Sequence, residues 1–315
     1  MTIDWNAWRP RLLYGGFFLV ALLLALRWTF PFGALQDRLA VEAAANGWQL
    51  QAAEAGPAGL IGVSLREVTL KDRAGLTIPL DRVDLTLPLW SLLTGKRRVA
   101  VEAWLYDGRG SGALDLAAGP QEFRVALDGI DLARVLPLRM ASGIDLTGLA
   151  SGTAYLLVPS DEKAKPEGRL ALTVKEAGFT GGKVDLPGVG ALTLPAARFG
   201  ELAVKLVLKD GKGTFETLGA TGGDVELVGE GLYFAWQPRL EFAPLFGKAR
   251  IKLAPAYASR PEVRAFSSLL DAALAGARSG EGAYGLQVFG SLGHPQVKPA
   301  GATPSYPTVP PPVPE

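Results

Sequence analysis

The chain has 315 residues, of which 48% are hydrophobic and 20% are charged, so it can bury at least one core of ordinary size. Its 32 basic and 31 acidic residues give a formal net charge of +1, without the basic excess that nucleic-acid binding requires. The absence of cysteine and the single histidine exclude disulfides, thiolate metal sites, cysteine nucleophiles and histidine-based metal sites.

The first predicted element is a transmembrane anchor over residues 11–30, following a cytoplasmic tail over residues 1–10. About 20 residues of helix span roughly 30 Å, which matches the hydrocarbon core of a bilayer. Basic residues before the span predict a cytoplasmic N-terminus and place the bulk of the chain across the membrane. The anchor residues are Arg9 and Arg11 before the apolar run, Leu12, Phe17, Phe18, Leu22 and Leu26 within it, and Arg27 and Trp28 at its far edge.

A cleaved signal peptide is the alternative for the same segment, since the apolar run Leu12–Leu26 is within the length of a signal core. The residues that follow, Arg27–Phe32, are bulky and offer no small-residue cleavage site. An uncleaved anchor is therefore the prediction.

An amphipathic helix is predicted over residues 32–46, because Leu35 and Leu39 are four residues apart and Ala43 continues the stripe. It is either a packing helix or a helix lying on the outer face of the membrane. Asn46-Gly47 predicts its end, and a strand begins at Trp48.

From Ile61 onward the apolar residues recur with a period of two, and a change of phase at Arg66-Glu67 predicts a bulge. Turns are predicted at Gly108-Arg109-Gly110 and, most clearly, at Asp210-Gly211. A short helical segment is expected over residues 130–138, with Leu132, Val135 and Leu136 inward. The other predicted strands are 83–87, 99–105, 111–116, 122–127, 148–158, 169–175, 190–194, 202–208, 213–218, 225–235, 249–253 and 284–292.

The last third contains one predicted helix, Ser259–Ala277, with a capping box formed by Ser259 and Glu262. The polar loop at 159–166 predicts a subdivision of the β-rich region, which covers residues 31–295. Residues 296–315 are Pro-rich and predict a disordered, polyproline-like tail. The predicted fold class is mainly β: an N-terminal transmembrane helix followed by a long twisted antiparallel sheet, with a sandwich or an open barrel as alternatives.

No group of residues predicts catalysis, a cofactor or a metal site. Gly108–Ala113 matches a loose dinucleotide pattern, but Gly119-Pro120 leaves no room for the required helix. His294 lacks an identifiable partner, and Asp224, Glu226 and Glu230 predict either a solvated strand face or a carboxylate pair. The basic run Lys96-Arg97-Arg98 marks a strand start or a contact with anionic lipid.

Several segments carry a resemblance to two related groups of envelope proteins. The passages Phe30–Trp48, Gly56–Leu60 and Leu65–Leu70 resemble the opening of AsmA-like proteins of Gram-negative envelopes. Asp145–Thr153, Gly229–Gly231 and Gly290–Pro295 resemble protein N of the type II secretion system, the GspN family. The resemblance implies an inner-membrane protein with a periplasmic β-rich region that acts as an accessory component of this system. It implies neither enzymatic activity nor a cofactor.

The sequence therefore leaves three functional hypotheses. The first is protein–protein interaction with the secretin, pseudopilus or inner-membrane platform proteins of type II secretion, through the edges of strands. The second is an AsmA-like module that binds or transfers membrane lipid along an apolar sheet surface. The third is a carboxylate-dependent hydrolase acting on envelope glycans.

Overall fold

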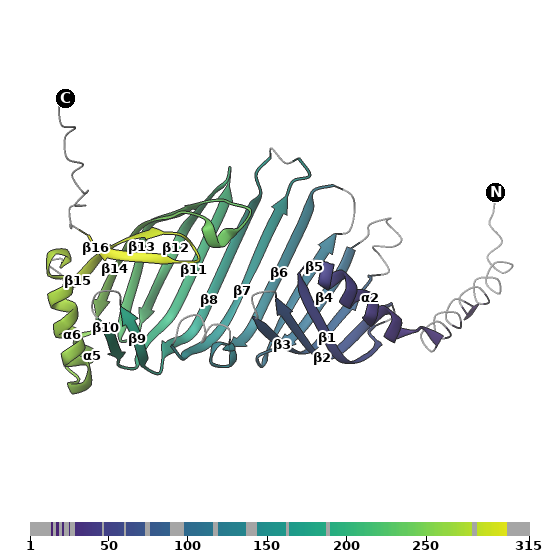
Figure 1. Cartoon of the computed structure of the whole chain (residues 1–315), viewed down its shortest axis with the longest axis horizontal. Helices are drawn as coiled ribbons and strands as arrows, with labels where there is room; N and C mark the ends of the chain where they lie inside the picture. Colours follow the sequence, from purple (N-terminus) through teal and green to yellow (C-terminus); the bar gives the residue numbers. More distant parts are fainter. Residues whose placement is uncertain are drawn as a thin grey trace, which may run out of the picture. The chain divides into compact units, whose positions relative to one another are not determined.

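The structure is a computed structural model of the chain. It describes residues 14, 17–18, 21, 25, 29–45, 47–59, 61–72, 76–88, 98–115, 119–136, 144–161, 164–186, 190–278 and 282–300. The chain is divided into two compact units, Met1–Ile130 and Asp131–Glu315. Their strands and helices are labelled in Figure 1. Each is built on an open antiparallel sheet with few short helices, so the prediction of a mainly β fold is confirmed. The loop at 159–166, where a subdivision was predicted, joins two neighbouring strands within the second unit.

The first unit has one described helix, α2 (Phe32–Ala45), followed by six strands paired in chain order. The strands are β1 (Trp48–Pro57), β2 (Gly62–Asp72), β3 (Thr77–Thr86), β4 (Arg98–Leu105), β5 (Gly108–Asp115) and β6 (Gln121–Asp131). The predicted stripe of α2 packs through Leu35 and Leu39 on the core of this sheet, where Leu65 and Val68 are each 1% exposed. The interpretation of α2 as a packing helix is confirmed, and Gly47 ends it with φ 86°.

The change of phase in β2 occurs at Glu67, which has φ 49°. Leu65 and Val68 both enter the core, as the sequence pattern requires. The pairing of β2 with β1 and β3 keeps the same register on both sides of Glu67, so no residue is inserted. The apolar residues therefore change phase because Glu67 has a left-handed backbone conformation. The predicted change of phase is present, but the predicted bulge is wrong.

The predicted turn at Gly108-Arg109-Gly110 is wrong by two residues. The hairpin between β4 and β5 turns at Tyr106 and Asp107, with φ values of 50° and 61°, and Leu105 pairs with Gly108. Both central residues of this two-residue turn are left-handed, as in a type I′ turn.

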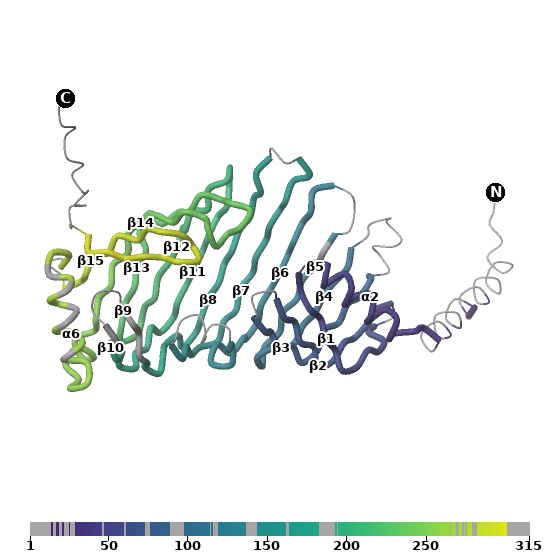
Figure 2. The backbone as a smooth tube through the Cα atoms, in the orientation of Figure 1, coloured from purple at the N-terminus to yellow at the C-terminus, as the bar shows by residue number. Residues whose placement is uncertain are grey.

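The second unit pairs eight strands in the order β7, β8, β11, β12, β13, β14, β15 and β16, beside a small β9–β10 hairpin (Figure 2). Its elements are η1 (Leu132–Arg134), β7 (Leu146–Val158), β8 (Glu167–Phe179), β9 (Gly182–Leu186), β10 (Gly190–Leu194), β11 (Ala197–Lys209), β12 (Lys212–Gly222), β13 (Val225–Ala235), η2 (Leu240–Phe242), β14 (Leu245–Leu253), α5 (Pro255–Ala258), α6 (Pro261–Ala273), η3 (Ala275–Ala277), β15 (Ala283–Gly290) and β16 (Pro295–Pro299). The predicted turn at Asp210-Gly211 is confirmed, with φ values of 53° and 74°. Leu136, which was expected to point inward after η1, is 54% exposed.

The predicted helix Ser259–Ala277 is interrupted, and its capping box is wrong. Ser259 closes α5, and its hydroxyl donates to the carbonyl oxygen of Ala256 at 3.0 Å. The carbonyl of Arg260 accepts the first backbone hydrogen bonds of α6, from Val263 and Arg264.

At the C-terminal side, β16 pairs with β15 through Val297 and Val288. The predicted tail therefore begins inside a strand, and residues 301–315 lie outside the described residues. The predicted strand 284–292 ends two residues earlier, at Gly290.

Among the described residues, no helix is long and apolar enough to cross a membrane. Of the predicted anchor residues, Phe17 and Phe18 are described, with exposed fractions of 74% and 68%. The other anchor residues and the tail over residues 1–10 lie outside the described residues, as do Lys96 and Arg97 of the basic run.

Candidate functional site

The most extensive feature of the second unit is a continuous apolar surface on one side of its sheet. Its first row crosses seven strands through directly paired residues. That row is Ala150, Val174, Leu202, Ala220, Leu227, Ile251 and Tyr284. Three further rows follow along the strands: Gly152, Leu172, Val204 and Leu218; Ala154, Leu170, Leu206 and Phe215; and Leu156, Gly168, Leu208, Gly213, Phe234 and Leu245. We call these four rows the apolar face.

The opposite side of the same strands carries the charged side chains, together with some apolar ones such as Val228 and Phe246, because successive side chains of a strand alternate between the two faces. Thr173 and Lys205 stand beside Leu172 and Leu206 in the sequence and belong to this opposite side, while no residue of the four rows is charged. At about 4.8 Å per strand the first row spans roughly 29 Å, and four rows cover roughly 20 Å along the strands.

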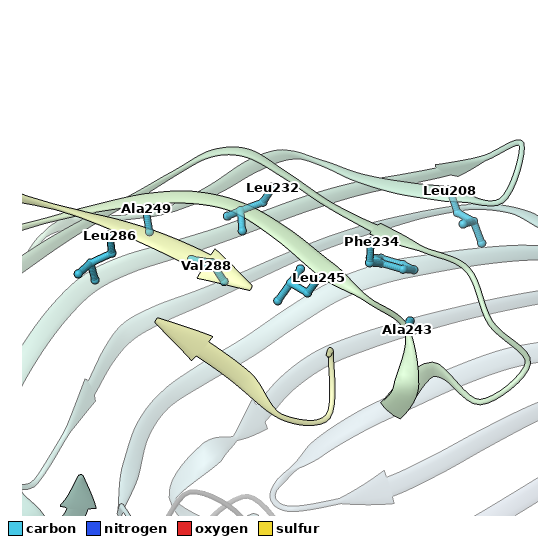
Figure 3. Packing of buried hydrophobic residues seen from close by; sticks show 8 residues of the cluster. All are labelled: Leu208, Leu232, Phe234, Ala243, Leu245, Ala249, Leu286 and Val288. Carbon is cyan, nitrogen blue, oxygen red and sulfur yellow. The ribbon is translucent and has the colours of Figure 1, made fainter. Parts of the chain in front are cut away.

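The apolar face is covered unevenly. Around β11 and β13–β15 it forms a buried cluster that includes Leu208, Leu232, Phe234 and Leu245 (Figure 3). Over β8 and β11, Leu172 and Leu206 are only half-buried. The described helices of this unit lie beside β15 in Figure 1, and α5–α6 pack on residues beyond the first row, including Ala197 and Val225. The two middle rows of the face are half-buried over β7, β8, β11 and β12, whereas Ala150, Val174 and Ala220 of the first row and Leu208 of the fourth are buried.

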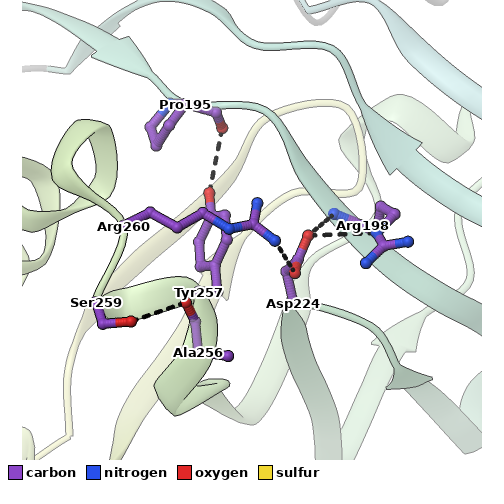
Figure 4. Close-up of polar contacts among 7 residues, drawn as sticks. All are labelled: Pro195, Arg198, Asp224, Ala256, Tyr257, Ser259 and Arg260. Atoms are coloured by element: carbon purple, nitrogen blue, oxygen red, sulfur yellow. Dashed lines mark hydrogen bonds and ion pairs between the residues drawn. The ribbon is translucent and has the colours of Figure 1, made fainter.

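Asp224 is the one predicted acidic residue that the structure buries, at 7% exposed. Its carboxylate accepts from the backbone N–H of Arg198 at 3.1 Å and from the guanidinium of Arg260 at 3.1 Å (Figure 4). Glu226 and Glu230 are exposed, and Glu230 pairs with Arg250. Neither alternative from the sequence holds for Asp224: it is neither solvated nor part of a carboxylate pair, and its contacts fasten α5–α6 to β11.

Two tyrosines form further hydrogen bonds between α5–α6 and the rest of the unit. The hydroxyl of Tyr257, which is 2% exposed, donates to the carbonyl oxygen of Pro195 at 3.3 Å. The hydroxyl of Tyr284 donates to Asp271 at 2.5 Å. Burial raises the pKa of both phenols, and the neighbouring carboxylates Asp224 and Asp271 raise it further, so both act as hydrogen-bond donors at neutral pH.

A polar cluster lies on the first unit, opposite its core. Arg82 donates to Asp84 at 2.7 Å and to Ser64 at 3.2 Å, and its guanidinium lies 4.8 Å from the ring centre of Trp104. Burial alone would raise the pKa of Asp84, but the hydrogen bonds from Arg82 and Ser64 hold that pKa below its usual range. Since Arg82 and Asp84 neutralise each other, this cluster is a structural ion pair.

The ends of β7, β8 and β11 surround a cavity of about 700 Å³. Of its charged lining residues, Arg198 faces Asp224 and Asp131 accepts from the backbone N–H of Ala133, which leaves Glu176. One remaining carboxylate does not provide an acid–base pair for catalysis.

The other candidates from the sequence also lack chemistry. His294 is exposed in the turn between β15 and β16, and its backbone bonds to Ser291. Gly108–Ala113 is strand β5, so no helix follows the loose dinucleotide pattern. No group of three or more histidine or acidic side chains is placed for a metal ion within the described ranges.

The apolar face could not be predicted from the sequence because it depends on how neighbouring strands pair. Alternation predicted that Leu202, Val204, Leu206 and Leu208 share one side of β11, but only the strand register aligns each of them with residues on three to six other strands. Comparison of the chain with family models, with curated proteins and with solved structures gives no match.

Proposed function

We propose that this chain is an envelope protein that binds the acyl chains of membrane lipids along the apolar face. The observation that carries the proposal is the set of four uncharged rows, whose two middle rows are half-buried over β7, β8, β11 and β12. Acyl chains bind without directional contacts, and each methylene group buried contributes about 0.8 kcal/mol. Burial of about eight methylene groups would thus contribute roughly 6 kcal/mol.

The proposal includes the predicted location. An uncleaved anchor over residues 11–30 would hold the chain at the inner membrane, with the N-terminus cytoplasmic and the β-rich region periplasmic. Arg9 and Arg11 support this orientation, and the apolar run Leu12–Leu26 supports the span. The proposed activity is binding without catalysis, and its ligand is abundant where the anchor would place the protein.

Site-specific photocrosslinking tests the proposal in the full-length protein in its membrane. A benzophenone amino acid replaces Leu206 on the apolar face, and the matched control replaces Lys205, the adjacent residue on the opposite face. Leu206 is half-buried and Lys205 is exposed, so accessibility alone would favour the control. We expect lipid adducts at position 206, detected by mass spectrometry of the tryptic peptide, and none at 205.

A second pair of positions, Leu172 and Thr173 on β8, repeats the comparison on another strand. Adducts at Leu172 and Leu206 alone support binding on the apolar face. Equal labelling on both faces, or no lipid at either apolar position while the variants remain folded, would overturn the proposal.

An accessory role in type II secretion is the second candidate. The segments that resemble the GspN family coincide with the start of β7, the centre of β13 and the turn between β15 and β16. The edges of the sheets give less support to contact through strand pairing, because α2 packs along β1 and because β16 begins and ends with proline, at Pro295 and Pro299. Recovery of secretin, pseudopilus or platform proteins with the full-length chain, together with a secretion defect in a deletion strain, would favour this role.

A further inference from the structure

Two large apolar side chains lie exposed on the loop that joins β13 and β14. The loop covers residues 236–244 and contains the single turn η2. Leu240 and Phe242 of this turn are 44% and 52% exposed. We call these two residues the apolar tip. Single exposed apolar residues are common on protein surfaces, so the case for a contact depends on how the tip is held and what surrounds it.

The loop is fixed to the rest of the second unit by its backbone. The N–H of Leu292, in the turn between β15 and β16, donates to the carbonyl oxygen of Ala243 at 2.9 Å. The N–H of Gly293 donates to the carbonyl oxygen of Glu241 at the same distance. Ala243 is 0% exposed and belongs to the buried cluster of Figure 3. The exposure of the tip is therefore a property of the folded loop.

The loop lies at one end of the apolar face. Phe234 and Leu245, which precede and follow it on β13 and β14, are directly paired members of the fourth row. Trp236 packs against the buried cluster that contains them. The loop thus closes the end of the face that the fourth row forms, and the tip is the exposed part of this end.

The turn between β11 and β12 meets the base of the same loop. The N–H of Trp236 donates to the carbonyl oxygen of Gly211 in this turn at 2.8 Å. Lys209 and Lys212, on either side of the turn, are exposed. Exposed leucine and phenylalanine beside a tryptophan and basic residues is the combination found in segments that lie in a membrane interface.

Charge contributes little to such a contact. Arg239 of the loop pairs with Glu241, and Asp210 lies between the two lysines in the sequence. The two segments therefore carry only a small excess of positive charge. Insertion of the apolar tip has to supply most of the binding, so the contact should form with uncharged lipid as well as with anionic lipid.

We propose that the apolar tip inserts into the surface of a lipid bilayer and places this end of the apolar face at the membrane. This inference rests on the proposed function, to which it adds the point where lipid passes between the membrane and the face. Leu240 and Phe242 lie among the headgroups and upper acyl chains, and Trp236 lies at the level of the interface.

The test uses site-specific fluorescence in the full-length protein. The chain contains no cysteine, so Leu240→Cys gives a unique position for an environment-sensitive fluorophore. The protein is reconstituted into phosphatidylcholine vesicles in which part of the lipid carries a nitroxide on the upper acyl chain. The matched control is Ala256→Cys, at an exposed position of α5 beyond the opposite end of β14. We expect quenching by the nitroxide lipid at position 240 and none at position 256.

A second substitution shows whether the tip itself carries the contact. Phe242→Asp in the Leu240→Cys protein should lower the docking equilibrium constant about tenfold, or about 1.4 kcal/mol, the order expected for the exposed half of a phenylalanine side chain. Phe242→Trp, which stays apolar, should keep the quenching. Val228→Asp is the matched control, because Val228 is 41% exposed on β13 and lies away from the loop. Unchanged hydrogen-exchange protection of β14 would show that the variants remain folded.

Several results would overturn the proposal. Equal quenching at positions 240 and 256, or none at either, would exclude insertion of the tip, as would unchanged quenching in Phe242→Asp. A fluorophore at position 240 that is shielded from an aqueous quencher but not quenched by the nitroxide lipid would assign the tip to a contact with protein instead.

The two proposals fail differently. Lipid adducts at Leu206 without quenching at position 240 would refute the docking of the tip and leave the apolar face as a lipid site. Quenching at position 240 without lipid adducts at Leu206 or Leu172 would refute the proposed function, and with it the passage of lipid, but not the membrane contact. If both hold, Phe242→Asp should also lower the yield of lipid adducts at Leu206, and an unchanged yield would refute passage at the tip.

Discussion

The close approach of Phe234 to Gly213 provides a direct test of how the fourth row of the apolar face is packed. A methyl group placed on Gly213 would lie 2.2 Å from Cε1 and Cζ of the Phe234 ring. Gly213 does not have a positive φ, so the backbone itself accepts alanine. The ring is 5% exposed and is held by the buried cluster, including Leu232 and Leu245, so it cannot swing aside freely.

Gly213→Ala is therefore expected to destabilise the second unit by overpacking, by about 1–3 kcal/mol. Phe234→Ala alone should cost about 3–5 kcal/mol, through lost burial and a cavity. In the double variant the added methyl group occupies space that the ring has left. The cost of Gly213→Ala should then fall close to zero, which gives an interaction free energy of about 2 kcal/mol between the two sites.

Hydrogen exchange of peptides from β12 and β13 in the full-length protein measures this cycle, because the chain contains two units and a single global unfolding transition is not assured. Gly276→Ala is the control, since nothing lies within 4 Å of a methyl group added there. Equal costs of Gly213→Ala in the presence and absence of the ring, within about 0.5 kcal/mol, would refute the packing argument.

Three further predictions follow from the polar contacts. Asp224→Ala should cost about 1–3 kcal/mol in chemical denaturation, because it leaves the partly buried backbone N–H of Arg198 and the guanidinium of Arg260 without their acceptor. Glu226→Gln on the exposed face should change stability little. Lys209 and Lys212 are exposed and directly paired, so Lys212→Glu should raise stability by about 0.2–1 kcal/mol in the same assay, since an opposite charge would then face Lys209. A fall in stability would contradict the repulsion expected between the two like charges. The pKa of Asp84 is lower in the folded protein than in the unfolded chain, where it is about 4. The stabilisation that ionised Asp84 gives the folded protein is therefore complete above about pH 4 and is lost as the pH falls through the lower pKa of the folded state. Hydrogen exchange of β3 at decreasing pH should accordingly show a steeper loss of protection in the wild type than in Asp84→Asn.

Strands and turns were predicted correctly where residues close together in the sequence determine them. Strand β13 has the predicted bounds, Val225–Ala235, because its apolar residues alternate between clear turn residues. The turn at Asp210-Gly211 contains the residue types that tolerate a left-handed backbone. The turn at Tyr106-Asp107 was missed because tyrosine is not a typical residue of that conformation, and the nearby glycines gave a stronger but misleading signal.

Long-range partners explain what the sequence could not predict. Asp224 resembles any solvated acid when read locally, and its burial depends on Arg260, 36 residues later in the chain. Strand β16 begins and ends with proline, which disfavours a strand unless it lies at an edge of a sheet. The apolar face likewise becomes visible only when the register of seven strands is known, because each strand alone shows ordinary alternation.

A sheet with one apolar face needs a second layer, and the two units meet this need differently. In the first unit α2 covers part of the sheet with Leu35 and Leu39. In the second unit α5–α6 pack beyond the first row, and under the proposed function a ligand completes the second layer over the half-buried middle rows of β7, β8, β11 and β12. A bound lipid should then stabilise this unit as a second layer would. Full-length protein stripped of lipid by extensive detergent exchange should lose about 2.7 kcal/mol relative to protein saturated at a hundred times the dissociation constant. The hydrogen-exchange protection lost on stripping should be concentrated in these four strands, since the lipid contacts them directly, whereas a uniform loss across β7–β16 would indicate that the sheet does not depend on a ligand for its second layer.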